Sequence, residues 1–229
     1  AADQQAMNDM LQAYPESLKQ AFGMDTLDFS SLIGFYGVQV YLITTLAGGV
    51  YAALLASGIV VKEESEKTIE FLLSKPVSRA GIIAQKLGAV LVNVLLFNLI
   101  LVAATLIGFQ FADAKLETDV YAALALATLL LHVTIAAISF LLSAIMSKSR
   151  SITSLSLGIV FLSYALHLIA GIAEGMSAIK HISLFAYVDA AAIVSSGSLD
   201  AGYTVIMLAV SLLCLTAAFL YYSRKDISV

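Results

Sequence analysis

The chain has 229 residues, of which 60% are apolar and only 12% are charged, and its mean hydropathy is +0.95. This balance lies far outside that of soluble domains and indicates a membrane protein. The single cysteine, Cys214, excludes a disulfide framework or a thiolate metal site within one chain, and the net charge of -4 matters less than the positions of the charges.

Five windows are long enough to cross a membrane as helices, because about 20 apolar residues span the hydrocarbon core. None of them contains Asp, Glu, Lys or Arg, and their uninterrupted apolar character excludes the alternating pattern of a barrel strand. The sequence therefore predicts an all-α, polytopic helix bundle as a single transmembrane domain over residues 1–229. Its predicted spans are 36–60, 87–109, 121–146, 152–173 and 203–222.

The segments between the spans differ in their charge, and this predicts the orientation. Segment 62–86, the 146–152 turn and the C-terminus hold nine of the twelve basic residues. The alternate segments, 1–35, 110–120 and 174–202, hold eleven of the sixteen acids. Because basic residues are retained on the cytoplasmic side, we expect the N-terminus outside and the C-terminus in the cytoplasm.

The two longest external segments are expected to contain short helices. Residues 6–23 have apolar positions at roughly helical spacing, and residues 176–197 are too apolar for a segment in water although they include Lys180, His181 and Asp189. Both patterns predict short helices that lie in the membrane interface or dip into it. An acidic external segment without an export signal predicts a further helix before Ala1, and thus six spans in the complete protein. Tyrosines at the span ends, Tyr36, Tyr121, Tyr203, Tyr221 and Tyr222, are expected to form an aromatic belt.

Few polar residues lie within the spans. His132, His167, Asn93 and Asn98 are expected to make hydrogen bonds between helices, with proton transfer or substrate contact as the alternative. His181 and Asp189 form only a weak candidate for a cation site. Small residues four apart give one smooth helix face, which predicts packing within the chain or contact with a second chain at a translocation route: Gly48, Ala52 and Ala56.

The charged stretch from Glu63 to Ser74 is predicted to be an amphipathic helix at the inner membrane surface. Ile69, Leu72 and Leu73 follow helical spacing on one face, and four Glu lie close together on the others. Pro76 disfavours helix before it, and Ser78 is expected to cap the next helix. One interpretation is a helix that merely joins two spans. Acids are unfavourable on an anionic leaflet, however, so a cytoplasmic protein partner is the better interpretation.

Three motifs carry a resemblance to a known family. EESEKTIEFLLSKPVSR has an acid-rich start followed by Thr68, Glu70, Leu72, Leu73, Pro76, Ser78 and Arg79. HISLFAYVD precedes the last span, with Leu184 where the family commonly has proline, and YYSRKDISV ends the chain. Together they resemble permease subunits of type-2 ATP-binding-cassette exporters over essentially the whole chain, without the family's first span.

The resemblance implies that Lys62 to Lys75 contains a coupling helix, which docks on a separate cytoplasmic ATPase subunit that binds ATP and Mg. The implied docking residues are Glu63, Glu64, Glu66, Lys67, Thr68, Glu70, Leu72, Leu73, Pro76 and Arg79. It also implies a second permease chain, identical or different, a multi-pass location in the plasma or inner membrane, and a route lined by spans 36–60 and 152–173.

No glycine in the chain is followed by lysine, which excludes a phosphate-binding G-x-x-x-x-G-K-[ST] loop. We therefore expect no enzymatic activity, bound cofactor, metal or nucleic-acid partner for this chain. The predicted function is a permease subunit of an ATP-driven exporter. The alternatives are a scaffold or assembly protein that docks a cytoplasmic partner, or an ion-coupled carrier, and the sequence does not identify a substrate.

Overall fold

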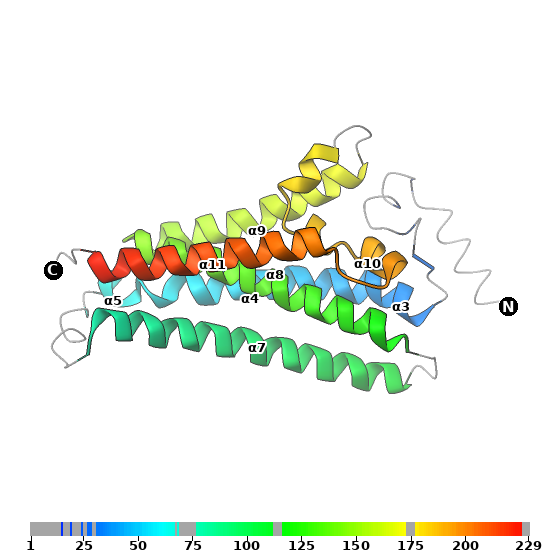
Figure 1. Ribbon diagram of the computed structural model, residues 1–229, viewed down its shortest axis with the longest axis horizontal. Helices are drawn as coiled ribbons and strands as arrows, with labels where there is room; N and C mark the ends of the chain where they lie inside the picture. Colours follow the sequence, from blue (N-terminus) through cyan, green and yellow to red (C-terminus); the bar gives the residue numbers. More distant parts are fainter. Residues whose placement is uncertain are drawn as a thin grey trace.

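The computed structural model describes residues 15, 19, 24, 27, 28, 31–66, 68, 77–111, 116–172 and 177–225. These residues form an elongated bundle of helices without a strand (Figure 1). Five of the helices are long and apolar enough to cross a membrane. The prediction of an all-α membrane bundle with five spans is therefore confirmed.

Each predicted span overlaps one of these five helices. The first helix runs from Leu32 to Ile59 and contains α3 (Leu32–Phe35), a π-helical segment (Tyr36–Val40) and α4 (Tyr41–Ile59). The other four are α7 (Arg79–Phe111), α8 (Thr118–Ile145), α9 (Ser149–Ile172) and α11 (Ala201–Arg224).

Shorter elements connect the spans at both ends of the bundle. α5 (Lys62–Ser65) follows α4, and α10 (Ala190–Ser196) precedes α11. Two 3-10 turns, Ser177–His181 and Ala186–Val188, lie between α9 and α10, where short helices were predicted. The predicted helix at 6–23 and most of the predicted Glu63 to Ser74 helix lie outside the described residues.

Local capping signals decide where several of these helices begin. Ser78 accepts a hydrogen bond from the Gly81 amide (3.0 Å) and starts α7, as predicted. Asp189 and Asp200 accept from amides in the first turns of α10 and α11, at 2.8 Å each. Gly197, with φ of 69°, ends α10 in the left-handed conformation that glycine adopts without steric cost.

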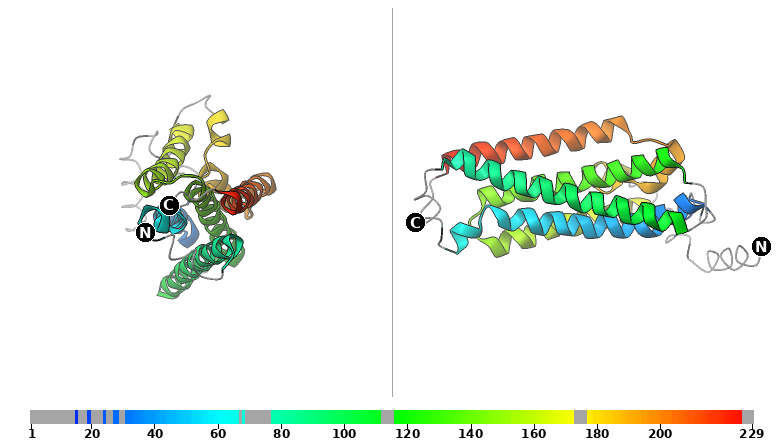
Figure 2. Two further views of the ribbon diagram at one scale, coloured as in Figure 1. Left: turned by 90° about the vertical axis from the view of Figure 1, so that its left-hand side faces the viewer. Right: turned by 90° about the horizontal axis from the view of Figure 1, so that it is seen from below.

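Helix α8 lies in the middle of the bundle, with the other four spans around it (Figure 2). In its most apolar stretch 67% of the residues are buried, against 17% in α7 and in α11. The apolar side chains that α7 and α11 leave exposed suit contact with lipid. The central position of α8 means that its polar residues must find partners on neighbouring helices.

The prediction that five tyrosines at span ends form an aromatic belt is wrong for three of them. Tyr36 and Tyr121 are 5% exposed and pack edge-to-face with Phe109, with ring centroids 5.4 to 5.5 Å apart. Tyr222 is fully buried at the other end of the bundle. Tyr36 and Tyr121 are buried by packing against each other and against Phe109, which a sequence position near a span end does not reveal.

His132 makes the hydrogen bonds between helices that its sequence position predicted. Its ring is fully buried, with Nδ1 3.1 Å from the side-chain oxygen of Asn98 on α7 and Nε2 3.2 Å from the Thr45 carbonyl oxygen on α4. Both oxygens are acceptors, and a neutral imidazole has one N–H, so the tautomer determines which of the two receives the hydrogen bond. The prediction also holds for Asn98. It is wrong for Asn93, which is exposed and donates to the Ala89 carbonyl of its own helix (2.8 Å).

The small-residue face of α4 lies inside the chain. Ala52 and Ala56 have no exposed surface, and a side chain added at Gly48 would overlap the His132 ring and meet Phe97 at 2.9 Å. Gly48 therefore allows α4 to approach α8 and α7 closely. In this structure the face is covered by helices of the same chain.

We expect the substitution Gly48→Ala to lower the thermal stability of the protein in detergent, because the new methyl group displaces the His132 ring from both of its partners. The cost is about 1–3 kcal/mol, typical of overpacking. The matched control is Gly58→Ala on the same helix, where a methyl group meets nothing within 4 Å. Equal melting temperatures for the two variants would contradict this packing.

Candidate functional site

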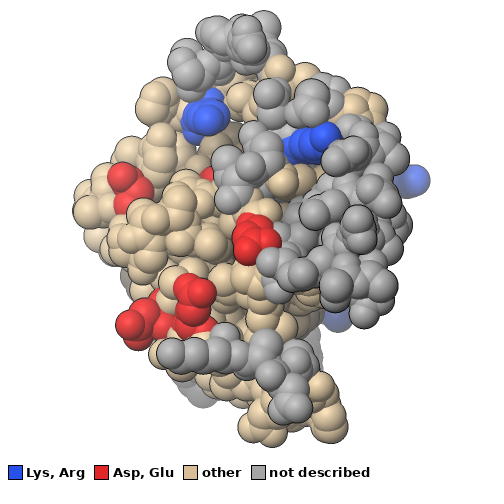
Figure 3. Space-filling view, turned by 90° about the vertical axis from the view of Figure 1, so that its right-hand side faces the viewer, with Lys and Arg blue, Asp and Glu red and all other residues tan. Residues whose placement is uncertain are grey.

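Two ends of the bundle carry the charged residues that the spans lack. The end with α5, the start of α7 and the end of α11 is called the α5 end below, and the opposite end, with α3 and α10, is called the α10 end (Figure 1). Acidic side chains gather on the α10 end (Figure 3). Those predicted docking residues that the structure describes lie at the α5 end.

Helix α8 fixes the junction between α4 and α5. The amides of Val60 and Val61, at the turn between the two helices, point to the hydroxyl oxygen of Ser143 at 3.2 and 3.3 Å. All three residues are fully buried. The hydroxyl therefore provides a partner for two backbone donors where the helical hydrogen bonds are interrupted, and it ties the base of α5 to α8.

Lys86 of α7 binds the same junction from another side. Its ammonium donates to the carbonyl oxygens of Ile59 (2.6 Å) and Val60 (3.4 Å), and it also pairs with the carboxylate of Glu63. Free carbonyls at a helix C-terminus carry partial negative charge, so a lysine is favourable there. The Lys86 side chain is only 12% exposed, which weakens screening by water.

Lys225, directly after α11, makes the second ion pair of α5. Its ammonium contacts both carboxylate oxygens of Glu64, at 2.8 and 3.0 Å, and the Ala144 carbonyl oxygen of α8 at 3.4 Å. The two paired side chains are 10% and 11% exposed. The guanidinium of Arg79 donates to the backbone carbonyl of Lys225. Neighbouring acids of α5 are thus tied to α7 and to the end of α11, and we call these two ion pairs the α5 clasp.

The predicted docking residues divide into three groups. Glu63 and Glu64 are half-buried in the α5 clasp, and Arg79 is half-buried against the end of α11. Glu66 and Thr68 are exposed, and Thr68 donates its amide to the Glu63 carbonyl (2.9 Å). The remaining five lie outside the described residues: Lys67, Glu70, Leu72, Leu73 and Pro76.

At the α10 end the structure does not bring His181 and Asp189 together. Asp189 caps α10 with one carboxylate oxygen, and the other lies 3.7 Å from Nε2 of His167 on α9. His181 accepts at its backbone carbonyl from the Tyr187 hydroxyl. Burial, and then the neighbouring Tyr203, raise the pKa of Tyr187, which keeps it a donor. The described residues hold no cluster of three His, Cys, Asp or Glu that could bind a metal.

A cavity of about 50 Å³ lies beside His167 and Asp189, between α4, α9 and α10. It is large enough for only one or two waters. Nearby, the Leu184 amide donates to the Ser163 hydroxyl at 2.8 Å. A proline, which is common at this position in the family that the chain resembles, has no amide hydrogen, so leucine here adds a hydrogen bond between α9 and the following turn.

Sequence reasoning missed Lys86, Lys225 and Ser143 as members of the site. In the sequence the two lysines indicate only the orientation of the chain, and nothing distinguishes Ser143 from the other serines of the spans. The location of both lysines at span ends was the one indication, because a basic residue there can bind the last carbonyls of a neighbouring helix. Its partner, however, depends on the three-dimensional arrangement.

We expect Lys86→Met to lower thermal stability by about 1–3 kcal/mol, the cost of losing charge-assisted hydrogen bonds at a largely buried position. The matched control is Lys148→Met at the same end, since Lys148 is exposed and makes no ion pair with a described residue. The check is thermal unfolding in one detergent. A loss of the same size in both variants would show that Lys86 contributes only its charge.

The comparisons with known proteins agree with the resemblance seen in the sequence. The family model described as ABC-2 family transporter protein matches residues 1–227. No curated protein matches the chain. Membership of this family implies, in general terms, an ATPase partner and dimerisation. The chain belongs to the ABC-2 transporter family and is a multi-pass membrane permease component of an ATP-binding-cassette transporter.

Proposed function

We propose that the chain is one half of the membrane part of an ATP-driven exporter in the plasma or inner membrane. A separate cytoplasmic ATPase subunit, which binds ATP and Mg, holds the segment from Lys62 to Lys75 and moves it. A second permease chain, identical or different, completes the membrane part. Membership of the ABC-2 family and the acidic character of this segment support the proposal.

The α5 end faces the cytoplasm in this proposal. Its described residues include three acids, Glu63, Glu64 and Glu66, and seven cations: Lys62, Arg79, Lys86, Lys148, Arg150, Arg224 and Lys225. The described charges of the α10 end are mainly acidic: Asp28, Glu117, Asp119, Asp189 and Asp200, against Lys19 and Lys180. Retention of basic residues on the cytoplasmic side supports this orientation.

The observation that carries the proposal is the α5 clasp. Two consecutive acids reach two helices that are far apart in the sequence, through Lys86 on α7 and Lys225 after α11. A displacement of α5 is therefore transmitted to both helices by short ionic contacts. Contacts of this kind are favourable only within a narrow range of distance and direction, so they resist separation of the partners.

In this proposal the charged segment after α4 has one part that faces the helix bundle and one part that faces the ATPase. Glu63 and Glu64 hold the membrane helices, and Arg79 fixes the end of α11. Glu66 and Thr68, which are exposed, begin the outward part. We assign contact with the ATPase to these two residues together with Lys67, Glu70, Leu72 and Leu73, and we assign the bend into α7 to Pro76.

His132 favours this function over an ion-coupled carrier. A proton carrier in a membrane span needs a ring nitrogen that can exchange its proton with water or substrate. Both nitrogens of His132 face groups of neighbouring helices, and its side chain has no exposed surface. The contacts support a structural role in joining α4, α7 and α8.

We expect Glu64→Lys and Lys225→Glu, each alone, to lower the amount of substrate moved per ATP hydrolysed by about tenfold, since each leaves two like charges facing each other at a half-buried site. The double variant restores the ion pair in reverse and recovers most of the coupling. Transport and ATPase activity are measured together in proteoliposomes.

The matched control for the swap is Arg150→Glu, an exposed charge reversal at the same end, and it is expected to leave coupling unchanged. If the double variant were as defective as the single ones, the clasp would not act as a pair. If all the variants transported normally, the clasp would not transmit motion.

We expect Leu73→Glu to uncouple ATP hydrolysis from transport while the chain still inserts, because a charge replaces an apolar contact with the ATPase. The loss exceeds tenfold, typical of a buried interface anchor. Leu73→Met, which keeps the apolar volume, serves as the control. Normal transport by Leu73→Glu would contradict docking through this residue.

A further inference from the structure

A groove at the α5 end shares Lys225 with the α5 clasp, and its other lining residues have no role in the proposed coupling. It lies between the ends of α8 and α11 and has a volume of about 720 Å³. Ile145 and Ser147 line it from the end of α8 and the turn after it, and α11 contributes four residues described below. The groove is open rather than enclosed, so a ligand there stays partly in contact with its surroundings.

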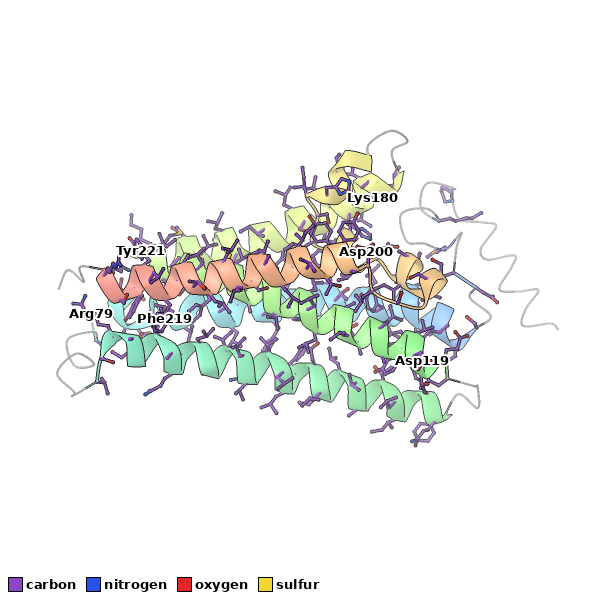
Figure 4. All side chains as sticks on the ribbon, in the orientation of Figure 1. Arg79, Asp119, Lys180, Asp200, Phe219 and Tyr221 are labelled. Carbon is purple, nitrogen blue, oxygen red and sulfur yellow. The ribbon has the colours of Figure 1, made fainter. Side chains whose placement is uncertain are left out.

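The wall formed by α11 changes in character along the helix. Ala217, Leu220, Tyr221 and Arg224 line the groove at positions i, i+3, i+4 and i+7, which places them on one face of the helix. Leu220 is 53% exposed and Tyr221 is 44% exposed. Figure 4 shows Tyr221 close to the end of α11. From the membrane towards its surface, the wall is apolar, then aromatic, then cationic.

Three hydrogen-bond donors line the groove without an acceptor in the part of the chain that the structure describes. They are the guanidinium of Arg224 and the hydroxyls of Tyr221 and Ser147, and no described carboxylate pairs with Arg224. Lys225, which also lines the groove, is different, because its ammonium is held by Glu64 and the Ala144 carbonyl. Lys225 thereby offsets the partial negative charge at the end of α8, whereas no described carboxylate neutralises the charge of Arg224.

The surroundings of the groove also favour an anion. The described residues of the α5 end include four more cations than acids, from the seven and three named above. Lys148 and Arg150, which closely follow Ser147, are both exposed. Clusters of basic residues at a membrane surface attract anionic lipid, and basic pockets between membrane helices bind anionic headgroups.

We propose that this groove binds an anionic phospholipid of the adjacent leaflet. The lipid phosphate accepts hydrogen bonds from Arg224, Tyr221 and Ser147, and one acyl chain lies along Ala217, Leu220 and Ile145. Arginine suits this role because its planar guanidinium binds two phosphate oxygens at once. A zwitterionic lipid is disfavoured, because its ammonium group meets an excess of positive charge.

The test is lipid retention by the full protein, purified in mild detergent with equal amounts of phosphatidylglycerol and phosphatidylcholine and examined by native mass spectrometry. We expect the wild-type protein to retain phosphatidylglycerol preferentially. Arg224→Gln should reduce this preference about fivefold, the contribution of one basic residue at a membrane surface. Arg224→Lys, which keeps the charge without the planar geometry, should fall between the two.

The matched control is Arg150→Gln, which removes one exposed cation from the same end but not from the groove, and it should keep the preference. An equal loss in Arg224→Gln and Arg150→Gln would overturn the proposal in favour of general surface attraction. Displacement of the lipid by millimolar inorganic phosphate would overturn it in favour of a free-phosphate site. Unchanged lipid retention with weaker ATPase co-purification in Arg224→Gln would assign the groove to the partner protein.

Discussion

The structure depends on one constraint, which is that polar groups inside a membrane bundle must bind one another because neither lipid nor a neighbouring apolar side chain can do so. Helix α8 shows its effect most clearly. Thr134 bonds to Ser211 on α11, His132 contacts α4 and α7, and Ser143 receives two amides at the α4–α5 junction. A helix that is buried on most sides and carries these groups has a single favourable rotation, which defines the positions of its neighbours.

The same constraint separates the two parts of the charged segment. At the base of α5 the carboxylates are only partly exposed, so each is neutralised by a lysine from another helix. Glu66, one turn further, is exposed and has no such need. The acids that face the bundle are therefore paired with lysines, and the acid that faces water is free to contact another protein. This arrangement suits a segment that has to be held firmly on one side and recognised on the other.

The sequence predicted the features that depend on local pattern. The five spans, the Ser78 cap and the hydrogen-bonded roles of His132 and Asn98 follow from apolar length, capping chemistry and the cost of a polar group in lipid. The features that depend on which helices are neighbours could not be predicted. Lys86 and Lys225 have no partner in their own helices, and the burial of Tyr36, Tyr121 and Tyr222 follows from packing that span boundaries do not reveal. Asn93 and Asn98 show the same limit, because only one of the two faces another helix.

Helix α7 has a mechanical consequence. Its 33 residues extend about 50 Å, while the hydrocarbon core is about 30 Å thick, so several turns project from the membrane. Lys86 lies about two turns into the helix, next to α5, and the helix runs along the flank of the bundle rather than through its centre (Figure 2). Asn98 meets His132 near the middle of this helix, and Phe109 packs against Tyr36 and Tyr121 near its far end, so α7 is held along its length. In the coupling proposed above, a shift of α5 moves this long helix as one piece, so that force applied on one side of the membrane reaches the other without any rearrangement inside the helix.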